Sequence, residues 1–274
     1  MGLLTLDVTR AGIVMSADSQ DVLLTEGACQ AVGEGTHLEK NKIIRVSAEH
    51  FRVLVGYVGT EKIGPTATRA WLERFIQAHS DAAALATFCV ELGRAPSQAW
   101  EEEQLDSCLW VFIAGYERSE PYFWYVVNAT GHDEFGLYTG VSRTFRVVND
   151  LDDTYLPEYT KHGLTKTQVL DERSFQFYNG AIFPGSFIFR GFDQMIQEIT
   201  RIRPPGFPSA FTLERYAFVV RQRMEFLKRL YSPKHGIYSP DAMPLVEGKV
   251  YVYALAPDGK FTEAPKQLTQ RKHI

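Results

Sequence analysis

Hydrophobic and polar residues alternate strictly at the beginning of the chain. In the segment LTLDVT, which follows Leu3, apolar and polar positions repeat with a period of two, the pattern of a half-buried strand. The segment RAG interrupts this pattern, and a second apolar run, GIVM, begins directly after it. We therefore expect a β-hairpin whose adjacent antiparallel strands cover residues 3–9 and 12–17.

The remaining pattern predicts strands and helices in alternating groups. Strands are predicted in six further segments: KIIRV, FRVLVGYVG, CLWVFIAGY, YFWYVVNATG, EFGLYTG and GKVYVYALAPDG. Apolar residues spaced by three and four predict helices in four regions: about residues 63–75, 81–101, 187–202 and 212–231. The order along the chain is therefore strands, two helices, strands, two helices and a last strand.

This order does not fit a parallel sheet built from strand–helix–strand units. It favours an α+β fold in which two antiparallel sheets pack face to face and a helix pair covers each outer face, a four-layer αββα sandwich. Sheets buried on both faces also explain why CLWVFIAGY is apolar throughout. We find no repeat or low-complexity linker and expect a single domain over residues 1–274, with an elaborated connection at about 146–186 that lacks a steady period.

The charge of the chain argues against a nucleic-acid partner. The net charge is -4 and the chain has no broad basic field that could follow a phosphate backbone. A local basic run on the last long helix is interpreted as a solvated face, comprising Arg221, Arg223, Lys228 and Arg229.

Cysteine usage and the apolar runs exclude further classes of protein. Cys29, Cys89 and Cys108 are widely spaced and odd in number, which argues against a disulfide framework or a zinc site. No apolar run approaches the roughly 18 residues of a membrane span. The N-terminus lacks the basic segment of a secretory signal. We expect a cytoplasmic protein with no cofactor, no metal and no membrane partner.

Several segments resemble proteasome subunits, which belong to the N-terminal nucleophile (Ntn) hydrolases. The segments GIVMSADSQ, KIIRV, the VGYVG turn into a helix, and WVFIAGYERSEPYFWYVVNATG match that family in order and nearly in spacing. The resemblance covers residues 2 to about 145 and about 187 to 260, and it implies the same four-layer sandwich. The connection at 146–186 and the long loop between Asp18 and Lys42 are additions to the family pattern.

The resemblance implies where a catalytic site would lie. In active β-type subunits a threonine freed by self-cleavage begins the first strand, its hydroxyl attacks a peptide carbonyl, and its α-amine serves as base. An α-amine suits this role because its intrinsic pKa, about 8, lies close to the working pH. By position, Asp18 and Lys42 match the aspartate and the lysine that accompany the threonine. Without the resemblance, Asp18 is interpreted as a turn-capping carboxylate and Lys42 as a solvated lysine at a strand end.

The nucleophile itself departs from the family pattern. Counting back from Asp18 places Gly2, which has neither hydroxyl nor thiol, where the threonine would stand. Thr5 is the nearest hydroxyl and the alternative nucleophile, although a chain that started there would lose about half of the first strand. Ser142, in the segment LYTGVSRTF, lies near the position of the serine that supports the site in the family.

Three functions remain open, and we expect the first. The chain is a non-catalytic, structural subunit that starts directly at its first strand without a propeptide, and it assembles with copies of itself or with proteasome-like partner subunits. Alternatively, it is an active Ntn amidohydrolase, a threonine-type peptidase with an unusual nucleophile and a peptide substrate. Finally, the fold serves as a binding module. On the last long helix, Phe218 lies outside the main apolar stripe and favours association, whereas Val219 and Phe226 border that stripe and either widen it or join the same contact surface.

Overall fold

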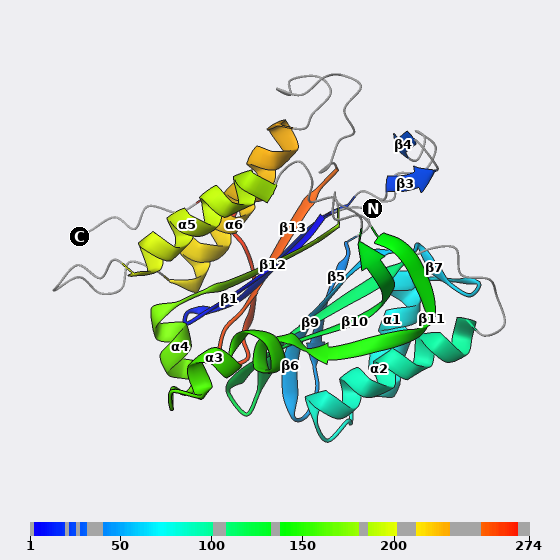
Figure 1. Cartoon of the computed structure of the whole chain (residues 1–274), viewed down its shortest axis with the longest axis horizontal. Coiled ribbons are helices and arrows are strands. Elements are labelled where there is room, and N and C mark those ends of the chain that lie inside the picture. Colours follow the sequence, from blue (N-terminus) through cyan, green and yellow to red (C-terminus); the bar gives the residue numbers. More distant parts are fainter. Residues whose placement is uncertain are drawn as a thin grey trace.

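The structure is a computed structural model with a mixed α and β architecture (Figure 1). Every strand pair among the described residues is antiparallel, as expected. The structure describes residues 3–19, 22–25, 28–31, 41–100, 108–132, 138–180, 186–201, 212–230 and 248–267.

The first large sheet contains the predicted N-terminal hairpin at its centre. β1 (Leu3–Thr9) and β2 (Gly12–Asp18) form this hairpin, and the Thr9 side chain closes its turn by donating to the Gly12 carbonyl at 2.9 Å. The prediction of adjacent antiparallel strands is confirmed. The strand order is β12-β1-β2-β13-β14, where the added strands are β12 (Phe175–Gly180), β13 (Val250–Leu255) and β14 (Phe261–Glu263).

The second large sheet is built from the middle of the chain. Its order is β11-β10-β9-β6-β5, with β5 (Ile43–Ser47), β6 (Phe51–Gly59), β9 (Leu109–Glu117), β10 (Glu120–His132) and β11 (Tyr138–Asn149). Two small hairpins accompany the large sheets, formed by β3 (Val22–Thr25) with β4 (Ala28–Ala31), and by β7 (Lys62–Ile63) with β8 (Thr66–Ala67).

Helices lie in pairs along the outer faces of the two sheets (Figure 1). Apolar side chains fill three contacts: sheet against sheet, the second sheet against its helices, and the first sheet against its helices. The second sheet packs against α1 (Thr68–Ala78) and α2 (Leu85–Trp100), and the first against α5 (Ser186–Arg201) and α6 (Leu213–Leu230). None of the helices in the described part of the chain is long and apolar enough to cross a membrane.

The sheets approach each other closely at Gly56 of β6. A Cβ atom built on Gly56 would lie 2.6 Å from the Met15 sulfur and 2.8 Å from Leu4 Cδ1. Met15 and Leu4 belong to the opposite sheet, so β6 packs against the hairpin without room for a side chain at this position. An alanine at this position would therefore have to displace the Met15 and Leu4 side chains.

The region at 146–186, expected to be an elaborated connection, forms regular elements. After the end of β11 come a π-helical turn η1 (Leu151–Tyr155), α3 (Pro157–Thr160) and α4 (Lys166–Glu172). Thr165 caps α4 in a reciprocal pair of hydrogen bonds with Gln168. The chain then enters β12, which pairs with β1 from Leu3↔Gly180 to Val8↔Phe175. This region therefore supplies a strand of the first sheet as well as a connection.

Candidate functional site

Asp18 and Lys42 meet beside the start of β1. The Lys42 Nζ atom lies 3.4 Å from Asp18 Oδ1, and the two side chains are 2% and 0% exposed. The same carboxylate oxygen accepts a hydrogen bond from the backbone N–H of Leu3 at 3.1 Å. The two residues that the resemblance associates therefore lie together near the first strand, and the interpretation of Lys42 as a solvated lysine is wrong.

The two residues come from different sheets. Asp18 is the last residue of β2 and pairs with Val250 of β13. Lys42 precedes β5, and its carbonyl accepts a hydrogen bond from the Tyr57 N–H at 3.2 Å. The ion pair therefore links the ends of the two sheets that form the central sheet-to-sheet core.

Further contacts fix the backbone around Lys42. The Asn41 side chain accepts from the Ile43 N–H at 3.0 Å and donates to the Tyr253 hydroxyl at 2.8 Å. Arg69 of α1 donates to the carbonyls of Asn41 and Ile43. Strand β13 and helix α1 thus both hold the segment that carries Lys42, so the ammonium group is positioned by several elements at once.

The chemistry of this pair is electrostatic. A buried lysine ammonium favours negative charge close to it, and a backbone N–H at the start of β1 adds a donor on the same side. A buried ion pair also needs its partners, because either charge left alone in the interior is costly. The arrangement can therefore stabilise an anion near the start of β1, or it can simply join the sheets.

The predicted nucleophile position cannot be described in the same way. Gly2 lies outside the described residues, although it is covalently joined to Leu3, whose N–H contacts Asp18.

Thr5, the alternative nucleophile, is engaged elsewhere. It lies within β1, is fully buried, and pairs with Ser16 on one side and Tyr178 on the other. Its hydroxyl is 2.6 Å from the Ser16 hydroxyl and accepts from Arg223 at 2.9 Å. This geometry gives Thr5 a structural role inside a polar cluster between the first sheet and its helices.

Ser142 is not brought to the Asp18 and Lys42 pair. It lies on β11, whereas Lys42 precedes β5 at the opposite edge of the same sheet. Four strand spacings of about 4.8 Å separate these edges. The Ser142 hydroxyl is 3.0 Å from that of Thr144 on its own strand. The structure therefore does not support Ser142 as part of this site.

The residue patterns did not reveal the polar cluster that contains Thr5. Arg223 of α6 is fully buried and donates to both oxygens of Asp7 on β1, at 3.2 and 2.8 Å. The Tyr216 hydroxyl donates to the same carboxylate at 2.9 Å. The expected solvated basic face is therefore wrong at Arg223, and also at Arg221, which is buried and donates to the Val250 carbonyl at 3.2 Å. In the sequence, this cluster is visible only as polar residues at alternate positions of β1.

The described cysteines are poor candidates for an alternative nucleophile. Burial raises the pKa of the Cys89 thiol well above its ordinary value, and it raises the pKa of Cys108 to about 12. A thiol reacts as its thiolate, so both side chains are protonated and unreactive near neutral pH.

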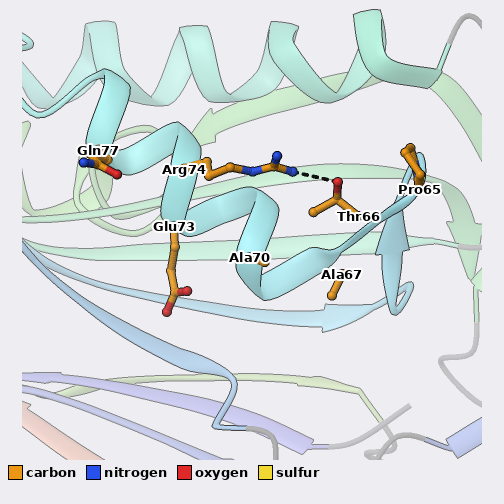
Figure 2. Close-up of a pocket in the computed structure, with 7 residues that line it drawn as sticks. All are labelled: Pro65, Thr66, Ala67, Ala70, Glu73, Arg74 and Gln77. Atoms are coloured by element: carbon orange, nitrogen blue, oxygen red, sulfur yellow. Dashed lines mark hydrogen bonds between the residues drawn. The ribbon is translucent and has the colours of Figure 1, made fainter.

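An open depression lies along the exposed side of α1 (Figure 2). It has a volume of about 660 Å³, and Arg74 crosses it to donate to the Thr66 hydroxyl at 2.6 Å. Its lining contains no residue of the predicted site and consists of Pro65, Thr66, Ala67, Ala70, Glu73, Arg74 and Gln77.

Comparison with known proteins identifies the fold. No family model matches the chain, and no curated protein matches it. A solved structure of Anbu (ancestral beta-subunit) from Yersinia bercovieri is similar, with a TM-score of 0.51 and 8% identity, covering 97% of this chain and 88% of that one. An Anbu (Gly-1) mutant from Hyphomicrobium sp. strain MC1 gives a TM-score of 0.50 and 10% identity, with the same coverage. The chain therefore has a proteasome-like fold, of mixed α and β type with antiparallel sheets.

Proposed function

We propose that this chain is a non-catalytic, structural subunit of an oligomeric assembly, built as a four-layer αββα sandwich of the Ntn-hydrolase type. The apolar contacts between sheets and helices support this layering. One structural neighbour is named an ancestral beta-subunit, which supports a role as one subunit among several. The partners are further copies of this chain or proteasome-like subunits.

One observation carries the non-catalytic assignment. The backbone N–H of Leu3 contacts Asp18, the residue before Leu3 in the sequence is Gly2, and glycine offers neither a hydroxyl nor a thiol for attack. Thr5 is the nearest hydroxyl in sequence, and it is bound to Ser16 and Arg223 in a buried position. In this proposal the ion pair serves to join the sheets.

The ion pair also favours a second candidate, an active Ntn amidohydrolase. A buried lysine held 3.4 Å from a carboxylate at the start of β1 is an environment that could stabilise the charge of a reaction intermediate. Such an enzyme would require a nucleophile other than a side chain at position 2.

Hydrolysis and intact mass separate the two candidates, and sedimentation tests whether the purified full chain assembles. We expect no hydrolysis of a panel of peptide amides above background, an intact mass no smaller than that of a chain starting at Gly2, and sedimentation as a species larger than 31.1 kDa. A processed species that starts at Thr5 would contradict the structural role.

Matched variants make the activity measurement specific. Hydrolysis that is lost in both D18N and K42M, and kept in D258N and K62M, would establish the second candidate. Asp258 and Lys62 are exposed, so they control for a change of charge without touching the buried pair.

A further inference from the structure

Helix α5 carries a carboxylate within its buried face. Phe189 and Ile196 are buried against the first sheet, and Asp193 lies four residues after one and three before the other. Residues at these spacings share one side of a helix. The Asp193 side chain is 23% exposed, so it is largely withdrawn from water yet still reachable by protons.

Asp193 ends a chain of polar contacts that links four elements. The Tyr178 hydroxyl of β12 donates to Asp193 and accepts from Arg223 of α6 at 3.3 Å. Arg223 binds Asp7 of β1 in a bidentate pair and lies 3.8 Å from Asp193. The guanidinium is therefore committed to Asp7, and Asp193 receives only its more distant attraction.

The charges of this cluster do not balance at neutral pH. With both carboxylates ionised, Asp7 and Asp193 face one guanidinium, and the buried cluster carries one excess negative charge. Protonation of Asp193 makes the cluster neutral, which removes the cost of an uncompensated charge at the helix contact.

The groups around Asp193 explain its proton affinity. Burial is the largest effect and raises the pKa of Asp193 to about 6, with the Asp7 charge acting in the same direction. The Tyr178 hydrogen bond and the Arg223 charge oppose this rise. Among the described residues, Tyr216 of α6 also donates to Asp7, and Arg190 and Glu198 are exposed on α5 itself.

We propose that Asp193 is a proton-operated latch that seats α5 on the first sheet when the carboxyl is protonated and loosens the helix when it is ionised. The helix follows β12, whose last residue, Gly180, pairs with Leu3 beside the Asp18 and Lys42 pair. The latch therefore acts on the strand that flanks the candidate site. It does not depend on whether that site is catalytic.

The direction of the pH effect follows from the sign of the shift. Because the pKa of Asp193 is raised in the folded state, the folded state binds more protons than an open state in which the carboxyl is solvated. The added stability is fully present below the ordinary pKa of about 4 and is lost as the pH rises through about 6.

Hydrogen exchange of the α5 backbone tests this proposal on the full chain. After correction for the intrinsic pH dependence of exchange, we expect the opening of α5 to increase about tenfold between about pH 5 and about pH 7.5. Helix α2, which covers the other sheet, serves as the internal reference and should not change.

Two variants complete the test. D193N has a neutral side chain of nearly the same shape, so α5 should keep its low-pH protection throughout the range, whereas E198Q should behave as the wild type. Equal pH dependence in D193N and the wild type would overturn the proposal. Protection of α5 in the wild type that is constant or rises with pH would overturn it even if D193N does not fold.

Discussion

At the scale of single residues, the buried pair of Asp18 and Lys42 makes a prediction about stability. Replacing one partner leaves the other charge without compensation in the interior, so we expect K42M to lose about 3–5 kcal/mol of the free energy of unfolding. The double variant D18N/K42M removes both charges and should be more stable than K42M. Urea unfolding of the four proteins of this cycle, including D18N, measures the coupling.

The control for this cycle is an exposed lysine. K62M lies on the surface hairpin β7 and should change the free energy of unfolding by no more than about 0.5 kcal/mol. If K42M lowers the free energy of unfolding by as little as K62M does, the pair does not stabilise the junction between the sheets.

Some residues of the site could be predicted from the sequence, and others could not. Asp18 and Lys42 were identified through the resemblance to proteasome subunits, because they occupy the positions of that family's aspartate and lysine. Arg223 was misinterpreted because its partner, Asp7, is 216 positions away in sequence. Local periodicity treats an arginine on a helix as solvated, and only the docking of α6 on β1 supplies the carboxylate that allows its burial.

At the scale of elements, the close approach of β6 to the hairpin predicts the effect of a single methyl group. G56A would place its Cβ atom against Met15 and Leu4, so we expect a loss of about 1–3 kcal/mol in the free energy of unfolding from overpacking. Thermal or urea unfolding provides the measurement.

The same substitution at another glycine is the matched control. Gly191 lies in α5, and no described atom comes within 4 Å of the place that an added methyl group would take. G191A should therefore stabilise the protein by about 0.5–1 kcal/mol through helix propensity. Equal effects of G56A and G191A on the free energy of unfolding would show that β6 and the hairpin can accommodate a methyl group without loss of stability.

The elements that were predicted are those with local signals. The N-terminal hairpin and the last two helices have regular periods, and the structure contains them at nearly the expected bounds. The helix expected at about 63–75 begins only at Thr68, because β7 and β8 form a small hairpin before it. Strand β12 lies in a region without a steady period over 146–186, and its identity as a strand depends on the edge that β1 offers. A pairing between residues so far apart leaves no signal within a short window of sequence.

At the scale of the whole molecule, apolar side chains on the outer helices predict self-association. Phe226 of α6 is 47% exposed, Met195 of α5 is 42% exposed, and the Phe226 ring lies 5.9 Å from that of Phe192. Phe218, which was expected to contribute, is half-buried. We expect wild-type protein to sediment above 31.1 kDa at micromolar concentration, and F226S to weaken association about tenfold.

An exposed valine on the helix pair of the second sheet is the control for the loss of apolar surface in F226S. Val90 of α2 is 37% exposed, and V90S should leave the sedimentation of the protein unchanged. A monomer of 31.1 kDa for the wild type at all concentrations would remove the support for an assembly through this surface.

Because β1 and β2 lie at the centre of their sheet, the strands that flank the N-terminal hairpin are synthesised long after the hairpin itself. The second sheet is formed by residues 43–149, so its strands emerge as one continuous block. The N-terminal hairpin emerges first, but its two neighbours, β12 and β13, end only at Gly180 and Leu255. At about 5–20 residues per second, the hairpin waits roughly 10–50 s for its last large neighbour. During that interval at least one edge of the hairpin can bind a chaperone or a neighbouring nascent chain, so these early strands are among the last to be protected.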